Sequence, residues 1–195
     1  MRKLKLQVQM SVDGFIGGPN GEMDWMTWTW DDKIKEYVNE LTDSVDTILL
    51  GRKMTPGFIG HWSAVQPSDP SYPFARKMMD KPKVVFSKTL DKSDPIAIGW
   101  KNTTIAKGDI SDEVNKLKNQ SRSLSGGKDI VVYGGAGFDS SLIKAGLIDE
   151  FHLFINPAAI GNGLPIFKEI SDKQQLKLVK AIPFDCGIVV LNYTR

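Results

Sequence analysis

Apolar and polar residues alternate strictly at the start of the chain. From residue 3 to residue 12 every odd position is polar and every even position is apolar. A period of two is typical of a β-strand that buries one of its faces. The dipeptide Asp13-Gly14 that follows is a common turn sequence. We therefore predict a strand up to residue 12 and a turn directly after it.

Short apolar runs predict further strands along the chain. They cover residues 47–50, 83–86, 103–106, 130–133 and 150–155. Runs of this length, rich in β-branched residues, fit strands that are buried in a sheet. Two later runs, 176–182 and 188–193, are separated by a short segment that contains Pro183 and Gly187. This arrangement predicts an antiparallel hairpin near the C-terminus.

Helical periodicity appears between these strands. Asp31 and Asp32 open a helix that runs to about residue 41, and carboxylates suit the first turn of a helix. A second helix is predicted over 111–124 with Ser111 as its N-cap, and a third over 138–145, ended by Gly146. Residues 74–79 predict a helical turn or two. Residues 56–73 are rich in Pro, Gly and Ser, which predicts a loop.

Strands that alternate with helices indicate one α/β domain over residues 1–195. Its sheet is expected to be parallel in the middle and antiparallel at its C-terminal end. A length of 195 residues, with 41% hydrophobic and 25% charged residues, is ordinary for a soluble globular protein. No apolar stretch approaches the roughly 18 residues of a membrane span. No signal-peptide pattern is present, so we expect a cytoplasmic protein that does not interact with membranes.

Charge and metal-binding residues narrow the possible functions. The chain has 25 Lys and Arg against 23 Asp and Glu, a formal net charge of +2. This balance argues against nucleic acid as a partner. The single cysteine, Cys186, excludes an intramolecular disulfide, and His61 and His152 lie far apart with no ligand spacing around them. The sequence therefore predicts no metal site.

Three predicted strands end in residues that suit an anionic ligand. The first ends in Gly51, Arg52 and Lys53, the second in Ser87, Lys88 and Thr89, and the third in Gly134, Gly135, Ala136 and Gly137, where Phe138 begins a helix. Ligands of open α/β sheets sit beyond the carboxyl ends of parallel strands. A glycine turn at a helix N-terminus favours a phosphate group. If the three strands are neighbours, their ends would suit a dinucleotide with an additional ribose phosphate.

Each of these segments also fits a plainer interpretation. A glycine cluster after a strand is often only a tight turn, and basic turns are usually solvated. The cluster at Gly134 does not match G-x-G-x-x-G, and no acidic residue ends a strand about 20 residues later. A Rossmann domain is therefore disfavoured, and the recurrence of similar residues at three strand ends carries the binding hypothesis.

The ordered set of motifs resembles the dihydrofolate reductase-like family, and more closely the reductase domain of bacterial riboflavin biosynthesis and its stand-alone relatives. The matching segments are 11–14, 49–55, 85–90, 133–150 and 161–167. The resemblance implies a mixed, mostly parallel central sheet flanked by helices, with a C-terminal antiparallel hairpin. It also implies NADPH as the hydride donor and a small-molecule substrate.

The family's motifs imply a role for each strand end. The turns with Gly51, Arg52 and Lys53 and with Ser87, Lys88 and Thr89 would hold the adenosine end and its 2′-phosphate. The segment from Gly134 to Phe138 would hold the pyrophosphate. Dihydrofolate reductases have a threonine where this chain has Met54, and Thr55 follows one place later. Their proton donor is a carboxylate at the start of the helix after the first strand, which makes Asp31 and Asp32 the catalytic candidates.

The substrate side of the site is expected at Asp13, Gly14, Trp25 and Trp30. Trp25, Trp28 and Trp30 border the expected mouth, where they would either stack on a flat substrate or anchor a long loop. The expected reaction resembles that of 5-amino-6-(5-phosphoribosylamino)uracil reductase. A dihydrofolate or pterin reductase and a nucleotide-binding protein without turnover are the alternatives. A homodimer is the expected assembly: the C-terminal hairpin or the alternating strand over residues 150–155 would offer an edge or a face to a second copy, and members of the family that the chain resembles are often dimers.

Overall fold

The computed structural model describes residues 1–120 and 127–195. Its strands form one 8-stranded sheet in the order β4-β3-β2-β5-β1-β6-β8-β7. The bounds are β1 Leu4–Ser11, β2 Val45–Gly51, β3 Lys83–Phe86, β4 Thr103–Ala106, β5 Asp129–Val132, β6 Glu150–Asn156, β7 Lys177–Pro183 and β8 Val189–Thr194. Neighbouring strands are parallel from β4 to β6, whereas β8 is antiparallel to β6 and β7. The predicted mixed sheet with a C-terminal hairpin is confirmed.

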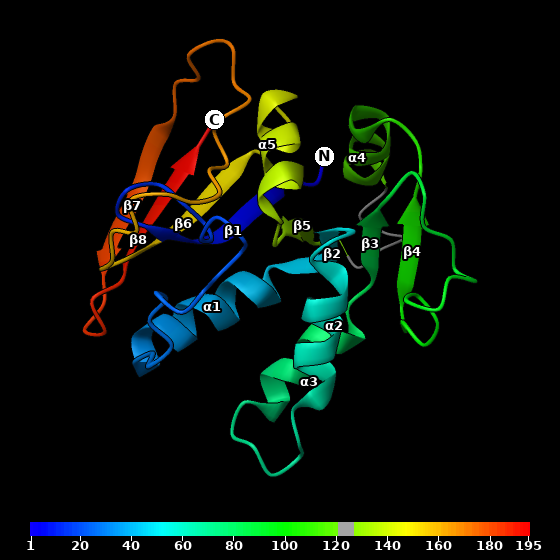
Figure 1. The fold of residues 1–195 in the computed structure, drawn as a ribbon, viewed down its shortest axis with the longest axis horizontal. Coiled ribbons are helices and arrows are strands. Elements are labelled where there is room, and N and C mark those ends of the chain that lie inside the picture. Colours follow the sequence, from blue (N-terminus) through cyan, green and yellow to red (C-terminus); the bar gives the residue numbers. More distant parts are fainter. Residues whose placement is uncertain (121–126) are drawn as a thin grey trace.

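Helices cover both faces of this sheet (Figure 1). The helices α1 Asp32–Asp43, α2 Thr55–Ala64 and α3 Tyr72–Asp80 lie on one face, and α4 Ile110–Asn119 and α5 Ala136–Lys144 lie on the other. The alternation along β1 explains this packing, because its apolar side chains join Val114 of α4 and Leu142 of α5 in one buried cluster. The polar side chains of β1 face α1 instead. Lys5, Gln7 and Ser11 of this polar half are buried, and Gln9 is partly exposed.

Two expectations from the sequence are wrong. Residues 56–73 are not mainly loop, because α2 occupies 55–64, with Pro56 in its first turn, where the missing N–H costs no hydrogen bond. Phe58 and Ile59 bury this helix against the sheet. The N-cap of α4 is Asp109 rather than Ser111, since the Asp109 carboxylate accepts from the backbone N–H groups of residues 111 and 112. The last residues of the helix predicted over 111–124 lie outside the described residues.

The helix after the glycine turn follows its expected limits closely. α5 ends with Ala145 as its C-cap, and Gly146 has a φ of 67°, the left-handed conformation that glycine adopts without strain. In the parts of the chain that the structure describes, no helix has the combination of length and hydrophobicity needed to cross a bilayer.

Candidate functional site

The three strand ends singled out from the sequence lie side by side. β2 pairs in parallel with β3 on one side and with β5 on the other. Gly51, Ser87 and Gly134 therefore lie at the carboxyl ends of three adjacent strands. The Gly51 backbone N–H donates to the Gly134 carbonyl at 3.0 Å, which joins two of these ends directly. The binding hypothesis required these three strands to be neighbours, and they are.

The glycine turn after β5 is open toward solvent. Gly134 has a φ of +98°, a conformation that side chains with a Cβ rarely adopt. Gly135 is the N-cap of α5, and neither it nor Gly137 would have any heavy atom within 4 Å of an added Cβ. The first N–H groups of a helix have no partner within the helix. This N-terminus therefore offers backbone donors next to empty space, as a phosphate site requires.

The opposite side of the same turn is tightly packed. A Cβ on Gly51 would lie 3.0 Å from Cβ of Phe138, and a Cβ on Gly134 would collide with the Asp139 carboxyl group. Asp139 is completely buried, and neither of its carboxyl oxygens has a hydrogen-bond partner among the described residues. Burial raises the pKa of Asp139 to about 8, so the group is mainly protonated at neutral pH. A neutral carboxyl group beneath the turn does not oppose an anion above it.

Arg52, Lys53 and Lys88 supply positive charge at this edge. All three side chains are exposed. Within the described residues, none of them forms an ion pair or a side-chain hydrogen bond, whereas Lys3, Lys77 and other cations of the protein are paired with carboxylates. These three cations are therefore available to an anionic ligand.

A surface hollow of about 310 Å³ extends the site beyond β3. It is lined by the end of β3, the start of α4 and one side of α5, with Phe86, Ser87, Lys88, Asp109, Phe138 and Ser141 among the lining residues. The rings of Phe86 and Phe138 lie 4.9 Å apart between their centroids. Such a hollow, with aromatic walls and a cation at its rim, fits a flat base that carries a charged group.

Ser87 and the threonines near the site have different partners. The Ser87 hydroxyl oxygen accepts from the backbone N–H groups of Thr89 and Leu90, at 3.3 and 3.0 Å, and so caps its own turn. Thr89 is exposed beside it. Thr55 is fully buried and donates to the Gly51 carbonyl at 3.0 Å, so its hydroxyl supports the turn from within.

Asp13 and Gly14 build the turn at the end of β1. The Asp13 carboxylate accepts from Ser11 Oγ at 2.6 Å and from the backbone N–H groups of Ile160 and Gly161 at 3.0 and 2.6 Å. These bonds lower the pKa of Asp13, the hydrogen bond from Ser11 having the largest effect. Gly14 has a φ of +93°. Asp13 thus holds the loop after β6 against the end of β1.

The tryptophan loop lies on the carboxyl end of β6. Trp30 stacks on Phe154 with 6.3 Å between ring centroids, and the exposed Trp28 stacks on Trp30 at 6.4 Å. Trp25 is partly exposed and donates to the Glu22 carbonyl. Asn156, completely buried at the end of β6, accepts from the Thr27 backbone N–H at 2.8 Å. The loop is therefore anchored, and it also presents aromatic surface to solvent.

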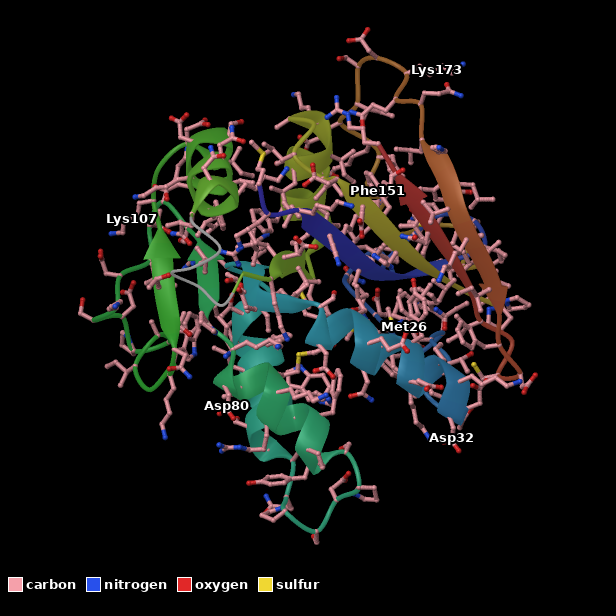
Figure 2. All side chains as sticks on the ribbon, turned by 180° about the vertical axis from the view of Figure 1, so that it is seen from behind. Met26, Asp32, Asp80, Lys107, Phe151 and Lys173 are labelled. Carbon is pink, nitrogen blue, oxygen red and sulfur yellow. The ribbon has the colours of Figure 1, made fainter. Side chains whose placement is uncertain are left out.

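The contacts of Asp31 and Asp32 weigh against a role in proton donation. Asp31 is the N-cap of α1, and its carboxylate accepts from the backbone N–H groups of Ile34 and Cys186. These bonds, led by that from Ile34, lower the pKa of Asp31 and favour its ionised form. Asp32 lies at the outer end of α1 in Figure 2, where it pairs with Lys35. Asp31 lacks the apolar surroundings that would raise its pKa, and the Asp32 side chain is exposed to solvent.

Sequence reasoning missed the polar groups beneath α1. His152 is buried, with its Nδ1 2.7 Å from the Tyr37 hydroxyl oxygen. Gln9, on the same face of β1, accepts from Asn156 Nδ2 at 2.8 Å. The polar positions of the β1 alternation were the available signal. Within the described residues, no three His, Cys, Asp or Glu side chains gather as a metal site.

The fold places the chain in the dihydrofolate reductase-like class. The dihydrofolate reductase of Enterococcus faecalis, complexed with NADP(H), has a TM-score of 0.59 and 16% identity over 99% of this chain and 96% of that chain. The diaminohydroxyphosphoribosylaminopyrimidine deaminase/5-amino-6-(5-phosphoribosylamino)uracil reductase of Thermotoga maritima has a TM-score of 0.64 and 17% identity, over 99% of this chain and 56% of that chain. At these identities the similarity is one of fold, and the predicted fold class is confirmed.

The sequence places the chain more narrowly. Residues 2–190 match the model of the RibD C-terminal domain, and the chain belongs to this family. The uncharacterized protein YyaP of Bacillus subtilis (strain 168) is 34% identical over 192 residues, which are 98% of this chain and 94% of YyaP. The family comprises NADPH-dependent reductases. The resemblance inferred from the ordered motifs is therefore confirmed.

Proposed function

We infer that this chain is an NADPH-dependent reductase that transfers a hydride to a small heterocyclic substrate. One observation carries the proposal: a glycine turn at a helix N-terminus and three unpaired cations lie at the ends of adjacent parallel strands. Anionic ligands of open α/β sheets bind at this place. Membership of a family of NADPH-dependent reductases supports the same function.

The residues present fit the cofactor. Backbone N–H groups at Gly135, Ala136 and Gly137 would bind the pyrophosphate in the open space over the turn. Arg52, Lys53 and Lys88 would bind the 2′-phosphate, aided by the hydroxyls of Ser87 and Thr89, and the hollow beside Phe138 would take the adenine. When bound, NADPH supplies the hydride for reduction of an imine or an activated C=C bond.

Hydride transfer to carbon must be balanced by a proton, which is added to the nitrogen of an imine or to the second carbon of an activated C=C bond. Asp31 is held ionised by its capping bonds, and Asp32 is exposed. Asp139 has a raised pKa, but it is completely buried on the inner side of the glycine turn. We propose that water delivers the proton to the substrate, while this chain binds and orients the reactants.

An aminouracil is the first substrate class to test. The Thermotoga maritima protein of the same fold is named as a 5-amino-6-(5-phosphoribosylamino)uracil reductase. Pterins are the second class, because dihydrofolate reductase has the fold as well. The aromatic stack of Trp28, Trp30 and Phe154 beside the end of β1 supports a flat substrate of either kind.

Two measurements on the purified protein test the proposal. The melting temperature is recorded with NADPH and with NADH, and the oxidation of NADPH is followed by its absorbance with aminouracils and dihydropterins. We expect NADPH to raise the melting temperature more than NADH does, because only NADPH carries the 2′-phosphate. Oxidation of NADPH in the presence of one of the heterocycles would support the proposed reductase function. Binding of NADPH without any oxidation would favour the second candidate, a nucleotide-binding protein without turnover. Failure of NADPH to raise the melting temperature would contradict both.

A further inference from the structure

We propose that Gln9 selects the substrate. Its side-chain amide presents an N–H donor of fixed orientation to a planar heterocycle that carries a carbonyl or ring-nitrogen acceptor. This inference rests on the proposed reductase function and deepens it, since it assigns a specificity-determining residue and a ligand chemistry. Gln9 lies on β1 near its carboxyl end, and no hydrogen bond in the part of the chain that the structure describes uses the donor end of its amide.

The orientation of the Gln9 amide follows from a backbone group. The Thr27 backbone N–H can only donate, so the Asn156 atom 2.8 Å away must be its oxygen, Oδ1. Asn156 Nδ2 then faces the other way and donates to the Phe154 carbonyl at 3.1 Å and to Gln9 at 2.8 Å. The Gln9 atom that accepts must in turn be its oxygen, Oε1. The Thr27 N–H therefore fixes the orientation of the Asn156 amide, which in turn fixes that of Gln9. As a result, Gln9 Nε2 points away from Asn156.

Gln9 Nε2 is left free. It has no hydrogen-bond partner in the described parts of the chain, and it is not among the fully buried polar atoms without a partner. Gln7 Oε1, two residues earlier on the same face of β1, is such a buried atom. Gln9 is partly exposed, whereas Gln7 is buried. The Gln9 donor therefore reaches solvent at a position where its carbonyl end is held by the protein.

Gln9 lies on β1, which is between β5, the strand before the glycine turn, and β6, which packs against the tryptophan loop. The last paired residues of β1 and β5 are Leu6 and Val132, and Gln9 and Gly135 each lie three residues beyond them. On its other side Gln9 is the direct register partner of Phe154 on β6. Gln9 therefore lies beyond the paired part of β1 and β5, toward the strand ends where the glycine turn begins, and next to the ring on which Trp30 stacks.

The surroundings favour a flat ligand with a polar edge. Phe154, Trp30 and Trp28 form a continuous stack that begins in the core and ends in an exposed ring. Aromatic faces bind flat apolar surfaces, and a single oriented amide donor adds directional recognition of an acceptor. If Gln9 served only to anchor the loop through Asn156, its Oε1 would suffice and its N–H groups would have no function.

Binding of two heterocycles to the full-length protein tests the proposal. Pterin and 5,6-diaminouracil are titrated by calorimetry into protein saturated with NADP⁺, for the wild type and for Gln9→Leu and Gln9→Glu. Gln66→Glu is the matched control, because Gln66 is exposed and lies in the loop after α2, away from this edge of β1. We expect both Gln9 variants to bind at least one heterocycle about tenfold more weakly or worse, the loss typical of one hydrogen bond, while Gln66→Glu binds as the wild type does.

A variant that leaves Gln9 in place gives an independent readout. In Asn156→Asp the carboxylate still accepts from Thr27, but it cannot donate to Gln9, so the Gln9 amide reverses and presents its oxygen to the ligand. This variant should lose heterocycle affinity as Gln9→Glu does while it keeps its affinity for NADP⁺. Unchanged binding by folded Gln9→Leu would overturn the proposal, and so would a wild type that binds neither heterocycle. A failure of the reductase function would appear separately, as an absent NADPH shift in the melting temperature of every variant.

Discussion

At the scale of single residues, the cations without partners carry the argument for an anionic ligand. Several exposed cations elsewhere in the fold, such as Lys33 and Lys107, form ion pairs with carboxylates. Arg52, Lys53 and Lys88 form no ion pair with the described residues, although all three lie at the carboxyl ends of β2 and β3. Substitutions of exposed side chains that make no such contacts change stability little, so removing one of these charges should leave folding intact. Their effect should appear in ligand binding.

Replacing Arg52 tests this expectation. Arg52→Gln should weaken NADPH binding about tenfold or more while NADH binding changes little, because a charge-assisted hydrogen bond contributes about 1.5–3 kcal/mol. Both dissociation constants are measured by calorimetry. Lys101→Gln is the control. Lys101 precedes β4 and therefore lies at the amino ends of the parallel strands, whereas Arg52 lies at their carboxyl ends. An equal loss for NADPH and NADH would contradict the assignment of Arg52 to the 2′-phosphate.

Asp139 predicts a pH dependence of stability. Burial raises the pKa of Asp139 from its ordinary 3.8 to about 8, so folding takes up a proton between these values. The contribution of Asp139 to the free energy of unfolding is most favourable below pH 3.8 and is lost as the pH rises through about 8. The melting temperature of Asp139→Asn, relative to wild type, should therefore be higher at pH 8 than at pH 5. A difference that is the same at both pH values would contradict the raised pKa.

At the scale of elements, α1 shows how one carboxylate is committed to structure. Asp31 satisfies the Ile34 N–H of the helix and also the Cys186 N–H in the hairpin between β7 and β8. Asp32, one residue later, has only the exposed pair with Lys35. The two adjacent acids therefore differ in their importance for folding.

Alanine substitutions distinguish the two acids of α1. Asp31→Ala should lower the free energy of unfolding by about 1 kcal/mol, the usual cost of losing an N-cap. Asp32→Ala should change it by less than about 0.5 kcal/mol. Denaturant unfolding of both variants measures the difference. Equal effects would show that the capping bonds of Asp31 do not stabilise α1.

The strands and the helix after the glycine turn were predictable because their signals are local. β1 alternates strictly, β5 is a short β-branched run, and Gly146 ends α5. α2 was missed because its Pro and Gly residues suggest a loop, and only packing of Phe58 and Ile59 on the sheet makes it a helix. The neighbourhood of β3, β2 and β5 was a hypothesis from similar strand ends. The bonds of Gln9 and His152 join residues more than 100 positions apart, which no local pattern reveals.

At the scale of the whole molecule, the sheet has an exposed edge at β7. Among the described residues this strand pairs with β8 alone, and Leu178 and Val179 are 52% and 49% exposed. Exposed apolar edge strands pair readily with other chains. We propose that the expected homodimer forms through this edge.

Light scattering of the eluted protein tests the dimer. The wild type should have the mass of two chains, and Val179→Lys should have the mass of one. Ile98→Lys is the control, because Ile98 is also exposed but lies before β4, at the other end of the sheet. A monomeric wild type would contradict the proposal, as would dissociation by Ile98→Lys alone.

The turn at Gly135 is proposed to hold the pyrophosphate of NADPH. An added Cβ at Gly135 meets no atom within 4 Å, so Gly135→Val should fold, yet its side chain would fill the space over the helix N-terminus. The control is Gly60→Val, at an exposed position of α2 that is equally open. Calorimetric titration with NADPH should show binding weakened about a hundredfold or more in Gly135→Val, since about two charge-assisted hydrogen bonds are lost, and unchanged in Gly60→Val. Wild-type affinity for NADPH in a folded Gly135→Val protein would contradict the account.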